Sequence, residues 1–278
     1  MANVVPLFDS KIPAAAKALG KVILVGAGPG DPGLLTRKAF AALTTADILF
    51  YDDLVSAEIL AEVPATVRRV YVGKPNGAAK ITQEEIISLL AEAARTYGHV
   101  VRLKGGDPLI FGRGGEEIEG LRAEGISVEV IPGITAAQGA ASSTHIPLTH
   151  RDHSAQISYI TAVRRDGALA DFRNLAGEGK TLVVYMGLGR ADDIAAALKA
   201  DGIAGDFPVA IIENATRPGE RRFVTAVDQL SATIAAQAVR SPALLLFGKV
   251  ATAASARVRA EDTAVTSGEF NWVHFAHG

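Results

Sequence analysis

Hydrophobic positions along the chain fall into two kinds of segment, short continuous apolar runs and longer stretches with a helical period. In the first half, runs typical of buried strands cover residues 21–25, 47–51, 67–72, 99–103 and 127–131. Segments with a helical period lie between them at 34–45, 56–63, 82–97 and 116–124. Thr82 and Glu85 have the spacing of a capping box, which marks the start of the third helix. Because apolar strands that alternate with helices are buried on both faces, we predict a mainly parallel sheet covered on each side.

The second half has a different order of elements. A helix of small residues is expected at 135–143 and a polar loop at 149–153, followed by strands at 157–161, 181–186, 209–213, 221–225 and 243–248. Two of these strands are separated only by residues 214–220, which favours an antiparallel hairpin and a mixed sheet. We therefore predict an α/β protein with two α/β domains, 21–133 and 134–255. Residues 1–20 are expected to form an N-terminal extension and 256–278 a C-terminal tail.

Composition narrows the class of protein. Hydrophobic residues make up 49% and charged residues 21% of the chain, a balance typical of globular proteins. The net charge of -2 predicts no general attraction to nucleic acid or membranes. The absence of cysteine excludes disulfides, thiolate metal sites and a cysteine nucleophile, and the six histidines lack the spacing of a metal site. With no apolar segment long enough to span a bilayer and no signal peptide, we expect a cytoplasmic protein.

The first candidate site is the loop at residues 26–33, GAGPGDPG, between a predicted strand and a helix. Its glycines let the backbone approach a ligand, and α/β sheets bind ligands at the carboxyl ends of strands. Two interpretations remain open here. A dinucleotide site needs a third glycine where Asp31 stands, and the alternative is the G-x-G-x-G loop of common adenosylmethionine enzymes. In both, Asp52 at the end of the second strand is the candidate ribose ligand.

The second candidate site is the loop at residues 102–117, RLKGGDPLIFGRGGEE, which leaves the fourth strand of the first half. It combines five glycines with nearby charges of both signs: Arg102, Lys104, Asp107, Arg113, Glu116 and Glu117. A solvated loop explains any one of these charges, but folding alone does not account for so many in one stretch. This loop is the strongest local indication of function.

Asp52 and Lys74 each lie at or just past the end of a predicted strand. Parallel strands bring such ends to one edge of the sheet, which is also the edge that carries both glycine-rich loops. A carboxylate and an amine placed there are candidates for general base and general acid. Taken separately, each is more often a surface charge.

Several ordered segments together resemble the uroporphyrinogen-III C-methyltransferases of the tetrapyrrole methyltransferase family. They are VGAGPGDPGLLT (25–36), YDDLVS (51–56), VGK (72–74), QEEI (83–86), VRLKGGDPLIFGRGGEE (101–117), VIPGITAA (130–137), HIPLTHRD (145–152) and YMGLG (185–189). The resemblance extends over roughly residues 21–250. It implies two α/β domains, a homodimer, and a cleft between the domains that binds S-adenosylmethionine and a tetrapyrrole.

The resemblance also implies roles for individual residues. The positions matched to the cofactor site are Pro29, Gly105, Gly106, Asp107, Ile110, Thr135, Ala136, Met186, Ala215 and Ala243. Asp52 matches the proton acceptor and Lys74 the proton donor. The tetrapyrrole side comprises Arg113, Glu116, His150 and Arg151, where basic groups suit a substrate that carries many carboxylates.

The resemblance implies methylation of uroporphyrinogen III at two ring carbons, C2 and C7, to give precorrin-2 for sirohaem, cobalamin or haem d1 synthesis. The chain departs from the family at residues 161–163, where Thr-Ala-Val replaces the usual Thr-Gly-His, and at 75–76, where Pro-Asn follows Lys74. Three alternatives are a methyltransferase for a later corrin intermediate, a non-catalytic tetrapyrrole-binding protein, and a nicotinamide oxidoreductase.

Overall fold

The computed structural model describes residues 19–73 and 81–253, and it contains two five-stranded sheets. The first sheet has the strand order β3-β2-β4-β1-β5, and all its pairings are parallel. Its strands are β1 (Lys21–Gly26), β2 (Ile48–Tyr51), β3 (Arg68–Tyr71), β4 (His99–Lys104) and β5 (Ser127–Ile131). Its helices are η1 (Pro32–Leu34), α1 (Arg37–Thr44), α2 (Ala57–Ala61), α3 (Gln83–Thr96) and α4 (Gly114–Ala123). We call this part the N-terminal lobe.

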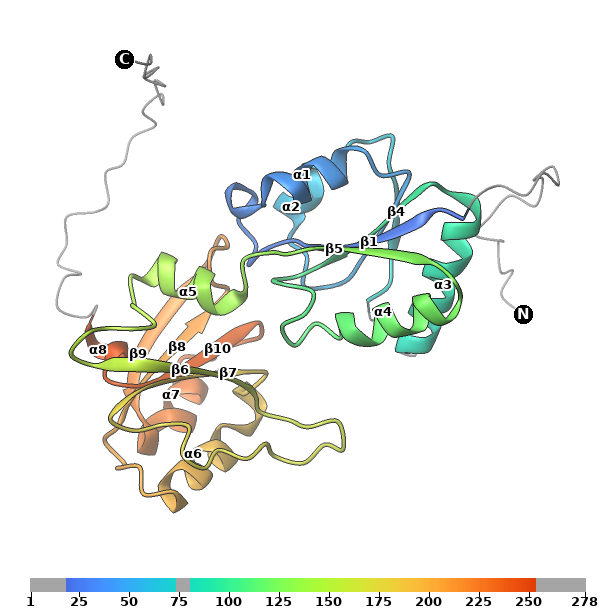
Figure 1. Ribbon diagram of the computed structural model, residues 1–278. Helices are drawn as coiled ribbons and strands as arrows, with labels where there is room; N and C mark the ends of the chain where they lie inside the picture. Colours follow the sequence, from blue (N-terminus) through green and yellow to red (C-terminus); the bar gives the residue numbers. More distant parts are fainter. Residues whose placement is uncertain (1–18, 74–80, 254–278) are drawn as a thin grey trace, which may run out of the picture.

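Helices cover both faces of the first sheet because its strands are apolar on both sides. Along β1, Ile23 and Val25 pack in one core cluster with α1 and α2. The alternate residues Val22 and Leu24 pack in a second cluster with α3 and α4. Figure 1 shows α1 and α2 above this sheet and α3 and α4 below it. The continuous apolar runs seen in the sequence therefore serve two separate cores.

The second sheet has the order β6-β7-β10-β8-β9 and is mixed. Only β6 and β7 pair in parallel, and the other three pairings are antiparallel. Its strands are β6 (Ser154–Thr161), β7 (Gly179–Tyr185), β8 (Pro208–Glu213), β9 (Arg221–Ala226) and β10 (Ala243–Phe247). Its helices are α5 (Ala136–Thr144), η2 (Leu188–Arg190), α6 (Ala191–Ala200), η3 (Val227–Gln229), α7 (Leu230–Ala236) and α8 (Val250–Ala253). We call this part the C-terminal lobe; α6 and α7 cover one face of its sheet, and α5 and α8 the other.

The predicted fold class is confirmed, including the parallel first sheet, the mixed second sheet and the β8–β9 hairpin. Most predicted boundaries differ from the structure by one or two residues, and two predicted starts differ by three. The helix expected at 34–45 begins only at Arg37, because the Thr36 hydroxyl accepts a hydrogen bond from the Ala39 backbone and caps it. The strand expected from residue 157 begins already at Ser154, with a bulge between Ser154 and Gln156.

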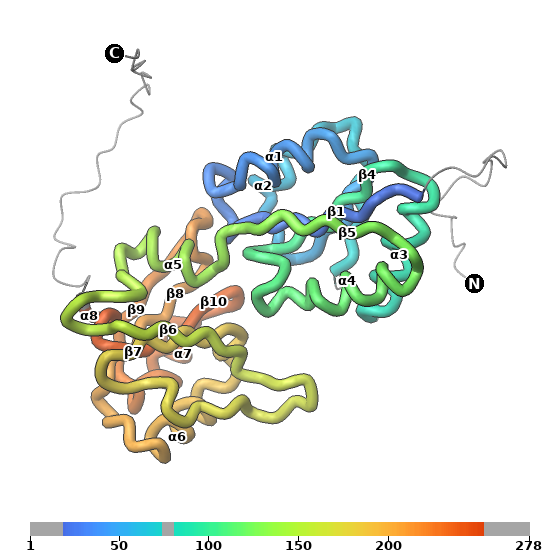
Figure 2. The backbone as a smooth tube through the Cα atoms, viewed as in Figure 1, coloured from blue at the N-terminus to red at the C-terminus, as the bar shows by residue number. Residues whose placement is uncertain are grey.

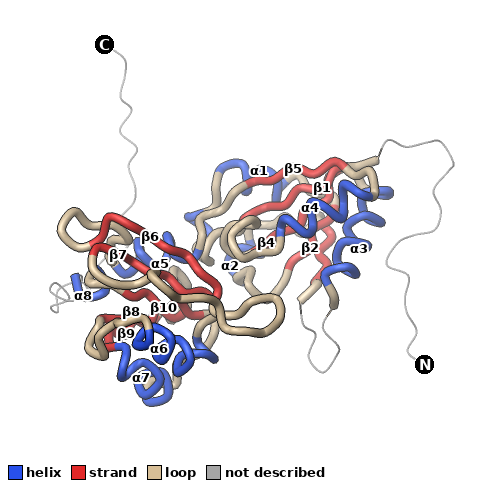
Figure 3. The backbone as a smooth tube through the Cα atoms, turned by 60° about the horizontal axis from the view of Figure 1, so that its bottom comes forward, coloured by secondary structure: helices blue, strands red, loops and turns tan. Residues whose placement is uncertain are grey.

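The two lobes lie side by side and are joined by residues 132–135 (Figure 2). The carboxyl ends of β1 and β4 point toward the C-terminal lobe (Figure 1). After a rotation of 60°, the two sheets are still separate, each with its own helices (Figure 3). The edge of the first sheet at which α/β proteins bind ligands therefore faces the second lobe.

Candidate functional site

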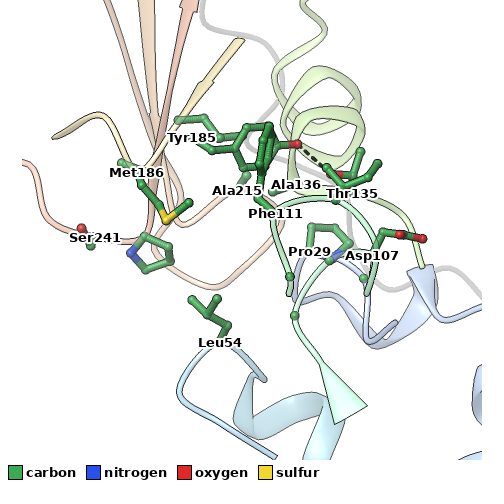
Figure 4. A pocket seen from close by; sticks show the side chains of 18 of the residues that line it. Pro29, Leu54, Asp107, Phe111, Thr135, Ala136, Tyr185, Met186, Ala215 and Ser241 are labelled. Carbon is green, nitrogen blue, oxygen red and sulfur yellow. Dashed lines mark hydrogen bonds between the residues drawn. The ribbon is translucent and has the colours of Figure 1, made fainter. Parts of the chain in front are cut away.

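A cavity of about 440 Å³ lies between the lobes, within the ~300–1,000 Å³ typical of small-molecule sites. The N-terminal lobe contributes the loops that follow β1, β2 and β4. The C-terminal lobe contributes the start of α5, the ends of β7 and β8, and the start of β10. All ten residues matched to the cofactor site lie in its lining: Pro29, Gly105, Gly106, Asp107, Ile110, Thr135, Ala136, Met186, Ala215 and Ala243. Figure 4 shows Pro29 and Asp107 of one lobe on one side of the cavity and Met186 and Ser241 of the other lobe on the opposite side.

The two glycine-rich loops are hydrogen-bonded to each other at the base of the cavity. The Gly28 amide donates to the Gly106 carbonyl at 3.1 Å, and the Gly106 amide donates to the Gly28 carbonyl at 2.7 Å. Both glycines have positive φ, 71° and 67°, which a residue with a Cβ rarely adopts. This contact exists because β4 pairs directly with β1, so their loops leave the sheet together.

Close backbone packing joins the same loops to the interlobe connection. A Cβ added to Gly26 would lie 2.4 Å from the Gly133 nitrogen and 2.7 Å from the Gly106 carbonyl oxygen. Asp107 strengthens this junction, since its carboxylate accepts from the Leu109 amide at 2.9 Å and from the Gly133 amide at 3.1 Å. The Asp107 side chain therefore fixes the loop that it belongs to against residues 132–135.

Aromatic side chains form part of the cavity lining on the C-terminal side. The Tyr185 hydroxyl lies 2.6 Å from the Thr135 hydroxyl and accepts from the Ala137 amide at 3.1 Å (Figure 4). Burial raises the pKa of Tyr185, although these two hydrogen bonds oppose the shift. The Phe111 ring packs on Tyr185 with 4.8 Å between ring centroids. The lining is mainly apolar, with charges at Asp53, Asp107 and Arg217, as expected for a ligand with a flat ring system and a polar end.

Asp52 lies beside this cavity, and its chain neighbours Asp53 and Leu54 are part of the lining. Its side chain is 24% exposed and accepts from Arg102 Nη2 at 2.7 Å and from the Leu54 amide at 3.1 Å. The carboxylate is therefore held in a fixed orientation and keeps access to solvent. The other predicted catalytic residue, Lys74, lies outside the described residues.

Beneath Asp52, the charges of the second loop form a buried network. Glu117 is fully buried, and its Oε1 accepts from Lys104 Nζ at 2.9 Å, from Gln83 Nε2 at 2.9 Å and from Arg102 Nε at 3.4 Å. Burial lowers the pKa of Lys104, and the nearby Arg102 charge lowers it further, while Glu117 opposes the shift. Arg102 therefore connects the buried Glu117 to Asp52 at the edge of the cavity.

The four residues assigned to the tetrapyrrole lie outside the cavity lining. Arg113 is the N-cap residue that precedes α4, and it donates from Nε and Nη2 to the two carboxylate oxygens of Glu116, at 2.9 and 2.6 Å. Both side chains are about half exposed. This pairing raises the pKa of Arg113 and lowers that of Glu116. His150 stacks on His153 at 4.5 Å between ring centroids, and Arg151 is exposed. The structure thus places these four residues outside the lining of the cavity, with Arg113 directly following the lining residue Gly112.

Asp31 weakens the dinucleotide interpretation. Its carboxylate accepts from the Gly33 amide at 2.8 Å and caps η1. An acid therefore occupies the helix start where a pyrophosphate would need free amides. Within residues 19–73 and 81–253, no group of three or more histidine, aspartate and glutamate side chains could hold a metal ion.

A family model described as Tetrapyrrole (Corrin/Porphyrin) Methylases matches residues 21–231. The chain belongs to this family. Similar proteins include Siroheme synthase 3 of Aeromonas hydrophila, 48% identical over 249 residues, and Siroheme synthase of Azotobacter vinelandii, 45% identical over 246 residues. These alignments cover 89% and 88% of this chain and 53% of each relative. The chain therefore spans about half the length of the curated relatives it matches.

Solved structures of tetrapyrrole methylases share this fold. Uroporphyrin III C-methyl transferase from Thermus thermophilus in its native form is 40% identical with a TM-score of 0.74, covering 84% of this chain and 94% of that one. The same enzyme complexed with S-adenyl homocysteine is 42% identical with a TM-score of 0.73, covering 84% and 100%. A cobalt precorrin-4 methyltransferase is 27% identical with a TM-score of 0.73, covering 83% and 95%. The predicted family is thereby confirmed.

Several residues of the cavity lining had no role assigned from the sequence. They include Leu54, Phe111, Tyr185, Arg217 and Pro242. Phe111 and Tyr185 lie within motifs that carry the family resemblance, whereas Arg217 and Pro242 lie outside them.

Within the described residues, no helix has the length and apolar character needed to cross a membrane.

Proposed function

We propose that this chain is an S-adenosylmethionine-dependent methyltransferase that methylates uroporphyrinogen III at C2 and C7 to give precorrin-2. The observation that carries the proposal is the convergence of all ten cofactor-assigned residues on one interlobe cavity. Support also comes from the 40–42% identity to the Thermus enzyme and from the capped helix start at Asp31, which disfavours a dinucleotide.

The cofactor would lie in the cavity, against the Gly28–Gly106 backbone pair and the aromatic side chains of Phe111 and Tyr185. Its sulfonium group would supply an electrophilic methyl group, and a reduced pyrrole ring offers an electron-rich carbon. The protein would then act mainly by holding the methyl group of the cofactor and the pyrrole carbon in the alignment that the transfer needs. The bonded loops and the Asp107 contacts provide that rigidity.

We assign the proton transfers to residues at the edge of the cavity. Asp52 would accept a proton from the substrate after the new carbon–carbon bond forms, and Arg102 orients its carboxylate for that step. Lys74 would act as proton donor. Arg113, Glu116, His150 and Arg151 would bind the carboxylates and ring nitrogens of the tetrapyrrole, outside the cofactor cavity.

We further propose that the chain acts as a homodimer, a state that light scattering would test.

One assay separates this function from its alternatives. Purified protein is incubated with radiolabelled S-adenosylmethionine and enzymatically generated uroporphyrinogen III, and label in the tetrapyrrole is measured. Asp52→Asn serves as the matched control, since it keeps the size of the side chain but removes the base. We expect incorporation with the unaltered protein and strongly reduced incorporation with the variant. Cofactor binding without any incorporation would point to a tetrapyrrole-binding protein.

A methyltransferase for a later corrin intermediate is the second candidate. It is favoured by the TM-score of 0.73 to the cobalt precorrin-4 enzyme and by the departure at residues 161–163. Thr161 ends β6, which is the edge strand of the second sheet, and Ala162 directly after it is fully buried. Faster incorporation into an already methylated precorrin than into uroporphyrinogen III would favour this candidate.

A further inference from the structure

Arg217 is an arginine of the C-terminal lobe that hydrogen-bonds to the N-terminal lobe. It lies in the loop between β8 and β9 and is part of the cavity lining. Its Nε donates to the Pro29 carbonyl at 3.1 Å, and its Nη2 donates to the Leu54 carbonyl at 2.5 Å. Pro29 follows β1 and Leu54 follows β2, and both also line the cavity. One guanidinium group therefore connects two loops of one lobe to a loop of the other.

The packing around this group is tight. A Cβ added to Gly30 would lie 2.5 Å from the Arg217 Cγ, and one added to Gly139 would lie 2.5 Å from the Pro29 Cγ. The neighbouring Thr216 hydroxyl also accepts from the Asp31 amide at 3.4 Å. The contact between the lobes at this point thus has no room for a side chain at Gly30 or for an additional carbon at Gly139.

The chemistry of the contact requires an arginine. Both acceptors are backbone carbonyls, and Arg217 forms no ion pair among residues 19–73 and 81–253. Burial lowers the pKa of Arg217, with Glu58 opposing the shift, yet a guanidinium remains charged at neutral pH. Its planar fork presents several donors in fixed directions, whereas a lysine offers a single nitrogen. A lysine would therefore preserve the charge without spanning both carbonyls.

We propose that Arg217 is a positioning residue that fixes the spacing of the two lobes across the cavity and thereby sets the affinity for the nucleoside ligand. The inference depends on the proposed function only for the choice of that ligand. Arg217 acts through its bonds to the Pro29 and Leu54 carbonyls and requires no direct bond to the ligand. A change at Arg217 should therefore weaken the binding of S-adenosylmethionine, the sulfonium form, and of S-adenosylhomocysteine, the thioether form, to the same extent.

The test compares Arg217→Ala, Arg217→Lys and the control Arg222→Ala by calorimetric titration with S-adenosylhomocysteine and S-adenosylmethionine. Arg222 is a suitable control because it also donates to two carbonyls, those of Thr144 and Ala251, but within the C-terminal lobe. We expect Arg217→Ala and Arg217→Lys each to weaken both ligands about tenfold, equivalent to ~1.4 kcal/mol. Arg222→Ala should lower the thermal midpoint and leave both dissociation constants unchanged.

Small-angle scattering without ligand provides an independent measurement. The radius of gyration should increase in both Arg217 variants and not in Arg222→Ala. Folded Arg217→Ala with unaltered affinity and radius would overturn the inference, and so would full rescue by lysine, which would assign the effect to charge. If the unaltered protein binds neither ligand, the proposed function fails, and the scattering comparison alone decides on Arg217.

Discussion

The buried charge network under Asp52 gives a sharp prediction for Glu117→Gln. The substitution keeps the volume of the side chain and one acceptor oxygen but removes the negative charge that faces Lys104 and Arg102. Arg102 retains Asp52 as partner, whereas Lys104 has no other ion pair among the described residues. Removing one partner of a buried pair costs ~3–5 kcal/mol. We expect a loss of about 3 kcal/mol, since the amide oxygen still accepts hydrogen bonds.

Urea unfolding at neutral pH measures this loss, and thermal unfolding should show a midpoint lower by roughly 6–12 °C. The effect should depend on pH. Burial lowers the pKa of Lys104 in the folded protein, so the unfolded chain binds more protons between that lowered pKa and the usual lysine pKa. Stability therefore rises with pH in this interval. Glu117 raises the pKa of Lys104, so its removal lowers that pKa further. The deficit of Glu117→Gln should therefore shrink as the pH is raised toward about 10.

Glu129→Gln is the matched control, because Glu129 pairs with Lys21 at 2.9 Å while both side chains are about 40% exposed. Exposed pairs contribute roughly 0–1 kcal/mol, so this variant should remain close to the unaltered protein. A deficit for Glu117→Gln below about 1 kcal/mol, or one that does not change with pH, would refute the assignment of Glu117 as counterion of a charged Lys104.

Three further predictions concern the cavity and its surroundings. Asp107→Ala should weaken S-adenosylhomocysteine binding at least about tenfold, because the Leu109 and Gly133 amides lose their acceptor, as titration calorimetry would show. Arg151→Ala should chiefly raise the KM for the tetrapyrrole. If Asp107→Ala and Arg151→Ala each weakened the cofactor and the tetrapyrrole equally, the proposed division into a cofactor part and a tetrapyrrole part would be contradicted. Tyr185→Phe should lower stability by about 1–2 kcal/mol in urea unfolding through loss of the Thr135 and Ala137 hydrogen bonds, and an unchanged midpoint would argue against those bonds.

Much of the fold followed from the sequence because local patterns and tertiary structure agree. The apolar runs became central strands with a core on each face, and the capping box at Thr82 and Glu85 begins α3. Patterns were less informative where burial is incomplete. The first residues of β6 lie at the edge of the second sheet and are largely exposed after Ser154, so hydrophobicity did not mark them. The alanine-rich helix α6 was not assigned, although its apolar residues face one core.

The sequence indicated ten residues of the cavity lining but not how they are arranged. Glycines at 28 and 106 indicated two ligand loops, yet their mutual hydrogen bonds depend on β4 lying beside β1, which the chain order does not reveal. For the residues around Glu117, the sequence showed only that several charges lie close together along the chain, and it did not predict their buried hydrogen bonds. Arg217 reaches residues more than 160 positions away, and no local pattern predicts such a contact.

The structure of the product tests the proposed C-methylation of uroporphyrinogen III at two ring carbons most directly. The purified protein is given uroporphyrinogen III and S-adenosylmethionine with a ¹³C-labelled methyl group, and the product is examined by mass spectrometry and ¹³C NMR. We predict two labelled methyl groups per macrocycle, one at C2 and one at C7. A product without label, or with label only at other positions, would contradict the proposed function.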